Sequence, residues 1–127
     1  ELNLSKRLKQ ASDLWLNNPR VPREASGTSG MTAAMNGAVN CSTHDGWICE
    51  FINPGNNGFV VPPIDYENIS VHEQDEYDLD ILENQVLPLY YDNPEVWREI
   101  TKNGMRDVRW QFDSNRMAKE YYDIMYK

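Results

Sequence analysis

The chain has 127 residues, of which 40% are hydrophobic and 25% charged, the size and composition of one globular domain. Its apolar runs extend for only a few residues, so no segment is long enough to span a bilayer. The formal net charge of −8 argues against nucleic acid as the main partner, because phosphate binding needs clustered lysine and arginine.

The charge is unevenly distributed. Residues 24–97 contain no lysine or arginine but hold 13 of the 20 acidic residues. An anion bound in this stretch must be held by backbone N–H groups and hydroxyls, unless cations reach in from elsewhere in the fold. The chain begins with Glu1 rather than Met and shows no apolar signal core, so we expect it to be part of a longer chain.

The first half predicts an α/β unit. Helix formers favour a short helix over residues 2–10, and residues 11–16 favour a strand that a following Asn-Asn-Pro ends. A loop of small residues then leads into a helix over 31–35, with Met31 and Met35 on one face, and a second strand is expected over 39–42. Strand, helix and strand in this order indicate a right-handed βαβ unit.

The second half predicts helices. A turn at 43–47, a tight loop at 53–58 and a short apolar segment at 59–61 come first. The acidic segment 65–83 is expected to be a solvated face, with a helix from residue 73 or 78 to 91. A helix from Pro94 to about Trp110 is expected to bury Trp97 and Trp110. The last helix, capped by Asp113 or Ser114, is expected to bury its apolar face, Met117, Tyr121, Ile124 and Met125.

The two cysteines favour free thiols in a cytoplasmic protein. Cys41 and Cys49 lie eight residues apart, and a disulfide framework is normally denser. His44 lies between them, but a fourth metal ligand would have to come from elsewhere, so no metal site is predicted.

The segment Ser26-Gly-Thr-Ser-Gly30 has the chemistry of an anion site. Glycines let a backbone approach a ligand closely, hydroxyls add donors, and the first N–H groups of a helix favour a negative charge. Glu24, just before it, could accept hydrogen bonds from sugar hydroxyls. The segment matches neither the P-loop nor the G-x-G-x-x-G pattern, and a plain glycine/serine cap on a buried helix remains open as an alternative.

Four motifs in order resemble the α-glucan phosphorylases, the glycogen, starch and maltodextrin phosphorylase family. They are Trp15-Leu-Asn-Asn-Pro-Arg, Glu24-Ala-Ser-Gly-Thr-Ser-Gly-Met, Asn36-Gly-Ala-Val-Asn and Asp45-Gly-Trp. The resemblance implies a GT-B architecture with the active site between two Rossmann-like domains. The chain, as a single domain over 1–127, would be the closing part of the C-terminal one, with a helical C-terminal half.

The resemblance also implies roles for single residues. Glu24, Ser26 and Gly27 would contact the sugar. Thr28, Ser29 and Gly30 would cradle a phosphate at the helix start. Asn36 and Asp45 lie in motifs that shape the site, where a supporting role and direct contact are both open.

Thr32 departs from the family pattern. In the family, a lysine at this position forms a Schiff base with pyridoxal phosphate, and a hydroxyl cannot form an imine. No lysine lies between Lys9 and Lys102, which argues against covalent attachment through this motif but leaves noncovalent binding open. No metal cofactor is expected.

The implied activity is transfer of glucosyl units between an α-1,4-glucan and phosphate, with glucose 1-phosphate as product. The fragment alone is expected to be inactive, because the family's opposite cleft wall, the N-terminal domain, is not in it. Two alternatives stay open: a nucleotide-sugar-dependent transferase similar to glycogen synthase, and a noncatalytic glucan-binding or regulatory protein.

Overall fold

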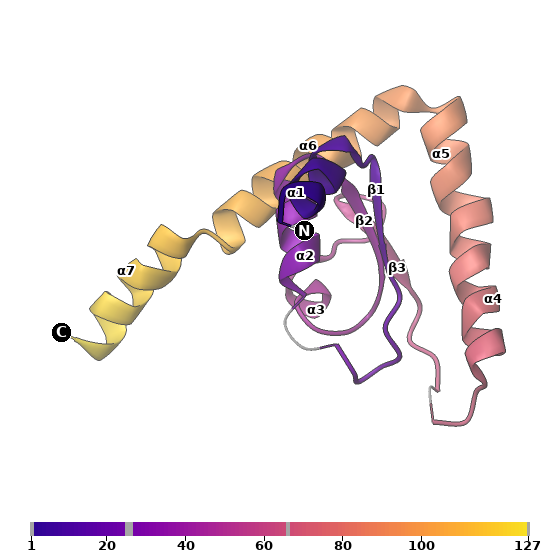
Figure 1. Ribbon diagram of the computed structural model, residues 1–127, viewed down its shortest axis with the longest axis horizontal. Coiled ribbons are helices and arrows are strands. Elements are labelled where there is room, and N and C mark those ends of the chain that lie inside the picture. Colours follow the sequence, from indigo (N-terminus) through magenta and orange to yellow (C-terminus); the bar gives the residue numbers. More distant parts are fainter. Residues whose placement is uncertain (1, 25–26, 66, 127) are drawn as a thin grey trace.

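A parallel sheet of three strands in the order β1-β2-β3 forms the centre of the computed structural model, which describes residues 2–24, 27–65 and 67–126 (Figure 1). The strands are β1 (Leu14–Asn17), β2 (Val39–Thr43) and β3 (Gly58–Val61). Trp15 pairs with Asn40, and Cys41 pairs with Phe59. Every residue of β2 is buried, as expected for the central strand of a parallel sheet covered on both faces.

The first half also contains helices before and between these strands. They are α1 (Leu2–Ala11), α2 (Thr28–Met35) between β1 and β2, and α3 (Ile48–Phe51) between β2 and β3. The predicted strand–helix–strand order is confirmed. The helix over 31–35 begins earlier than expected, at Thr28, and the first strand begins later, because α1 continues through Ala11. The apolar segment at 59–61 pairs with β2 as part of β3.

A long helical column follows the acidic loop. It consists of α4 (Val71–Ile81), a π-helical turn η1 (Leu82–Val86) and α5 (Leu87–Asp92). Pro88 explains the wide turn, because proline has no N–H to donate and its ring crowds the carbonyl four residues before it. The helix predicted to end near residue 91 is confirmed. It starts earlier than predicted, at Val71, and the π-helical turn η1 interrupts it.

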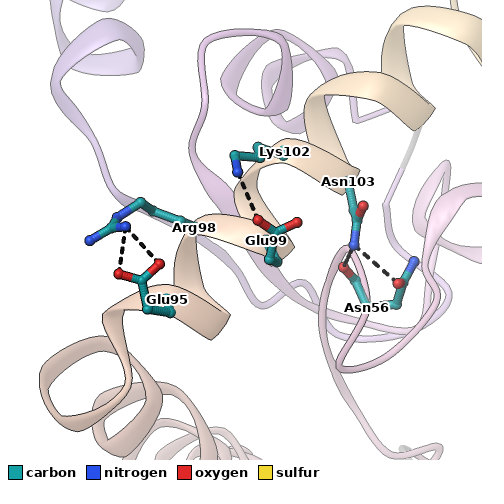
Figure 2. Close-up of polar contacts among 6 residues, drawn as sticks. All are labelled: Asn56, Glu95, Arg98, Glu99, Lys102 and Asn103. Atoms are coloured by element: carbon teal, nitrogen blue, oxygen red, sulfur yellow. Dashed lines mark hydrogen bonds and ion pairs between the residues drawn. The ribbon is translucent and has the colours of Figure 1, made fainter.

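The helix α6 (Pro94–Gln111) joins the two halves of the molecule. Its outer face carries the ion pairs Arg98–Glu95 and Lys102–Glu99 (Figure 2). Its inner side reaches the loop before β3, where Nδ2 of Asn103 donates to the backbone oxygen of Asn56 at 3.0 Å and to its Oδ1 at 3.1 Å (Figure 2). This contact anchors the loop that precedes β3.

Two hydrophobic clusters cover the two faces of the sheet. The first joins β2 and β3 to the helical column and to α6, and its buried members are Val39, Cys41, Phe59, Val61, Ile81, Val86, Trp97 and Ile100. The second joins α2 and α3 to α6, and its buried members are Ala34, Trp47, Ile48, Phe51 and Val108. Because Ile100 and Val108 lie in different clusters, α6 links both cores.

The last helix, α7 (Ser114–Met125), corrects one prediction. Asp113 caps it as expected, accepting from the N–H groups of Asn115 and Arg116. The face that was expected to be buried is exposed, and Ile124 is 80% accessible. Figure 1 shows α7 extending away from the sheet, so no described part of the chain covers this face. The amphipathic spacing correctly predicted which side chains share a face of α7. It could not predict whether another element of the fold packs against that face.

Two further predictions about burial are wrong. Trp97 is buried in the first cluster, but Trp110 is 79% accessible, because it lies on the side of α6 opposite the buried Val108. The acidic segment is not solvated throughout, because Gln74 and Asp78 face inward from α4 and are buried. Among the described residues, no helix combines the length and apolar character that a membrane span requires.

Candidate functional site

The candidate site lies where β1 and β2 end. In a parallel sheet the carboxyl ends of the strands share one edge, and ligands of open α/β sheets bind outside that edge. Glu24 lies in the chain after β1 and Asp45 after β2, and a hydrogen bond joins the two residues at this edge. Ser26, which was predicted to contact sugar, lies outside the described residues.

Asp45 fixes the backbone of the loop. Its Oδ2 accepts from the N–H of Glu24 at 2.9 Å, and its Oδ1 accepts from the N–H of Gly46 at 2.9 Å. One carboxylate therefore ties the loop after β1 to the turn after β2. These bonds lie within the protein, and the two roles that the sequence left open for Asp45 stay predictions.

Asn17 orients the carboxylate of Glu24. Its Nδ2 donates to Oε2 of Glu24 at 3.0 Å. Glu24 is half-buried, so this bond restricts where its second oxygen can point. Sequence reasoning missed Asn17, although its position as the last residue of a strand ahead of a small-residue loop is the signal that could have identified it.

The two glycines of the loop make room for Trp47. A Cβ on Gly27 would lie 2.3 Å from Cδ1 of Trp47, and one on Gly30 would lie 2.9 Å from its Cζ2. Gly27 also has a φ of 68°, in the left-handed region that favours glycine. Trp47 is buried and stacks on Phe51 with ring centroids 4.6 Å apart. The glycines are thus explained by packing inside the protein, whatever ligand the loop binds.

The first turn of α2 carries Thr28 and Ser29. Gly27 is the N-cap and contributes no side chain, and the N–H of Gly30 donates to the carbonyl of Gly27 at 3.1 Å. The N–H groups at such a helix start have no partner within the helix, and the helix dipole favours an anion beside them. Because Thr28 is exposed and Ser29 half-buried, this end of the helix is open to a ligand.

The sequence of the chain is similar to those of several known proteins. No family model matches the chain. Curated relatives include maltodextrin phosphorylase of Thermococcus litoralis, 45% identical over 90% of this chain, and glycogen phosphorylase of Aquifex aeolicus, 40% identical over 90%. Glycogen phosphorylase of Mycobacterium tuberculosis is 31% identical over 99% of the chain. The chain matches a segment of the α-glucan phosphorylases. It spans only 14%, 17% and 15% of these three relatives.

Thr32, the position where the resemblance implied a cofactor lysine, is engaged within α2. Oγ1 of Thr32 donates to the carbonyl of Thr28 at 2.9 Å, one turn earlier. The exposed side chain of Thr32 lines a hollow together with Lys6, Lys9 and Asn36. Asn36 is the C-cap of α2, and its Nδ2 donates to the carbonyl of Thr32 at 2.8 Å.

Two titratable groups of this phosphorylase-like chain are buried beneath the sheet, away from the loop. Burial, together with the smaller effect of the nearby Asp78 carboxylate, raises the pKa of the Cys41 thiol to about 12, so Cys41 is an inert thiol. Burial also raises the pKa of Asp78, partly offset by a hydrogen bond from Nδ2 of Asn18 at 3.0 Å. Both belong to packing rather than to the candidate site.

Cys49 differs from Cys41. It is an exposed free thiol, and its Sγ lies 3.6 Å from Nδ1 of His44. No group of three or more His, Cys, Asp or Glu side chains able to hold a metal ion occurs within residues 2–24, 27–65 and 67–126.

Proposed function

We propose that the chain is part of a GT-B glycosyltransferase that moves glucosyl units between an α-1,4-glucan and phosphate. The observation that supports this most directly is Glu24, whose carboxylate is bonded to Asn17 and whose N–H is bonded to Asp45 at the carboxyl edge of a parallel sheet. Glu24 belongs to the region in which maltodextrin and glycogen phosphorylases match the chain. The parallel sheet and its helices would form part of a Rossmann-like domain in a cytoplasmic enzyme.

Within this proposal the residues have distinct tasks. The carboxylate of Glu24 accepts hydrogen bonds from hydroxyls of the glucosyl unit, while Asn17 holds one of its oxygens. Ser26 and Gly27 offer backbone groups to the same sugar. Thr28, Ser29 and Gly30 surround a phosphate with backbone donors, in a stretch where residues 24–97 provide no lysine or arginine.

The donor set also suits pyridoxal phosphate, the family's cofactor. The helix start would provide donors for its phosphate, whereas the hydroxyl of Thr32, bonded to the carbonyl of Thr28, forms no imine with its aldehyde. When bound, the cofactor would supply a phosphate next to the substrate phosphate. The protein's own contribution is to bind and orient both anions, because fixed donors stabilise charge that develops in the transition state.

The replacement Glu24→Gln tests the proposed role in the full-length protein. We expect glucose 1-phosphate release from glycogen and inorganic phosphate to fall roughly 10- to 100-fold in kcat/KM, the loss of a hydrogen bond to a charged group. The matched control is Glu95→Gln on the outer face of α6, which should leave the rate unchanged. An unchanged rate in Glu24→Gln, with an unchanged urea midpoint, would contradict the assignment.

The same assay separates the alternatives. Glucosyl transfer that proceeds only with a nucleotide sugar would favour a transferase similar to glycogen synthase. Thr32, in place of the family's cofactor lysine, is the reason to include this alternative in the test. No transfer with either donor, together with retained glucan binding, would favour a noncatalytic glucan-binding protein.

A further inference from the structure

The segment that leads from β1 to Glu24 is held at its start by α4. Nε2 of Gln74 donates to the backbone carbonyl of Asn18 at 3.2 Å, and Nδ2 of Asn18 donates to Oδ2 of Asp78 at 3.0 Å. Gln74 and Asp78 are each 4% exposed and lie one turn apart on α4. One face of this helix therefore fixes both the main chain and the side chain of Asn18.

Asp78 packs beneath the sheet, outside the candidate site. A buried carboxylate lowers stability unless it is paired, so packing alone does not explain an acidic residue at this position. In the part of the chain that the structure describes, Oδ1 of Asp78 has no hydrogen-bond partner, so Nδ2 of Asn18 is the one donor to this carboxylate. The contact that Asp78 makes is thus with the segment that precedes Glu24.

The residue before Asn18 holds Glu24 itself. Nδ2 of Asn17 donates to Oε2 of Glu24 at 3.0 Å. Of two adjacent asparagines, one is bonded to α4 and the other to Glu24. A shift of Asn18 moves Asn17 as well, because a planar peptide unit joins them and leaves few soft dihedral angles between them. Glu24 is therefore linked to the inner face of α4 through two residues.

The residues after Asn18 are also tied to the fold. Oγ1 of Thr43, which is fully buried at the end of β2, donates to the carbonyl of Pro19 at 2.9 Å. The guanidinium of Arg20 donates to the carbonyl of Ile69, in the loop before α4. The segment is thus held at three consecutive residues before it turns toward the candidate site.

We propose that Gln74 and Asp78 of α4 are positioning residues for Glu24. They act through the adjacent pair Asn17 and Asn18. This inference rests on the proposed function for what Glu24 binds, and on the contacts above for how it is held. A carboxylate that is already held in one direction loses less freedom when it binds the hydroxyls of a sugar.

Reciprocal replacement of the asparagine and the aspartate tests the link in the full-length protein. Asn18→Asp removes the donor and sets a second carboxyl group against that of Asp78. Because Asn18 is exposed, this change buries no new group. We expect kcat/KM for glucose 1-phosphate release from glycogen and inorganic phosphate to fall roughly tenfold, since a small displacement of a positioned group slows a reaction strongly.

Hydrogen exchange gives a readout that does not depend on activity. The N–H of Arg23 donates to the carbonyl of Arg20, and the N–H of Glu24 donates to Asp45. In Asn18→Asp, these two amides should exchange roughly tenfold faster, as measured by mass spectrometry.

The double replacement Asn18→Asp, Asp78→Asn restores an amide–carboxylate bond with its direction reversed. It should return both kcat/KM and amide exchange to within about twofold of the unmodified protein. The matched control is Asn84→Asp, because Nδ2 of Asn84 donates to Oδ1 of Asp80 at 2.7 Å on the exposed side of the same helical column. This control breaks the same kind of bond and should leave both quantities unchanged.

A cycle with Glu24→Ala separates positioning from a general structural effect. If Asn18 acts through Glu24, then Asn18→Asp should lower kcat/KM by less than about twofold once the Glu24 side chain is gone. A general structural effect would lower it by the same factor in both backgrounds, and that result would overturn the proposal.

Three other results would also overturn it: unchanged amide exchange in Asn18→Asp, faster exchange with an unchanged kcat/KM, or no recovery in the double replacement. The proposed function fails in a different way. If the full-length protein releases no glucose 1-phosphate, but amide exchange responds to Asn18→Asp and recovers in the double replacement, the positioning of Glu24 is retained and the proposed function is contradicted.

Discussion

Gly27 shows how one residue can meet two demands. Its φ of 68° requires the left-handed region, and its missing Cβ leaves room for Trp47. The sequence left two interpretations of the loop glycines open, close approach of the backbone to a ligand and a plain cap on a buried helix. The structure adds a packing reason that could not be derived from the sequence, since Trp47 is 20 residues away.

The replacement Gly27→Ala is therefore expected to destabilise the chain more than a positive φ alone would. Gly55→Ala is the matched control, because Gly55 has a φ of 75° and nothing within 4 Å of an added Cβ. We expect the control to lower the free energy of unfolding by about 1–2 kcal/mol and Gly27→Ala by a further 1–3 kcal/mol from overlap with Trp47. Urea unfolding measures both, and equal losses would show that Trp47 does not restrict the loop.

Asp78 gives a pH dependence whose sign can be stated. Burial raises its pKa in the folded chain, so its contribution to stability is greatest below the unfolded value of about 4 and is lost as the pH rises through the folded value. Replacing it by Asn removes the ionisation and keeps an acceptor for Asn18.

We expect the free energy of unfolding of the unmodified chain to fall relative to Asp78→Asn between pH 4 and pH 7. Urea unfolding at each pH gives the difference, and Asp80→Asn, at an exposed position of the same helix, should show no such trend. A constant difference across this range would mean that Asp78 ionises as freely as in the unfolded chain.

At the scale of elements, α6 and α7 show what periodicity can and cannot predict. The start of α6 at Pro94 and the Asp113 cap of α7 were predicted from local chemistry, and both are confirmed. The burial of Trp110 and of the apolar face of α7 was wrong, because burial depends on what lies opposite a helix. The strand β3 was missed as a strand, since four residues ending before Pro62-Pro63 carry too little pattern.

Hydrogen exchange should distinguish these two helices. Ile100 and Val108 anchor α6 in both clusters, whereas α7 has no buried residue and carries side-chain pairs such as Arg116–Glu120 along its surface. Such pairs contribute about 0.2–0.5 kcal/mol each, too little to hold a helix of 12 residues by itself. We expect amides of α7 to exchange about a hundredfold or more faster than those of α6. Equal protection in the 127-residue chain would contradict this.

At the scale of the whole molecule, the candidate site occupies one edge of a small sheet. The loop, its flanking strands and the helix after it were predicted from the sequence, because small residues, glycines and strand ends are local signals. The bonds from Asn17 and Asp45 to Glu24 were not, since they join segments 7 and 21 residues apart through the fold. The hollow between α1 and α2 was missed for the same reason.

This arrangement predicts that the 127 residues alone do not release glucose 1-phosphate from glycogen and phosphate. The loop presents donors to one side of a ligand only, and transition-state stabilisation of a phosphate needs charge or dipoles around it. The measurement is a coupled assay on the isolated chain beside the full-length protein. A rate from the isolated chain comparable to that of the full-length protein would contradict the division of the site between domains.

The packing of Trp47 beneath Gly27 and Gly30 has an optical consequence. The fluorescence of an indole ring depends on the polarity and motion of its surroundings. This ring lies against Gly27 and Gly30, next to the backbone that is proposed to bind phosphate. A variant can be made in which phenylalanine replaces the other three tryptophans, Trp15, Trp97 and Trp110. Its tryptophan fluorescence then comes from Trp47 alone. The protein thereby contains its own reporter of occupancy, one that needs no label and no turnover.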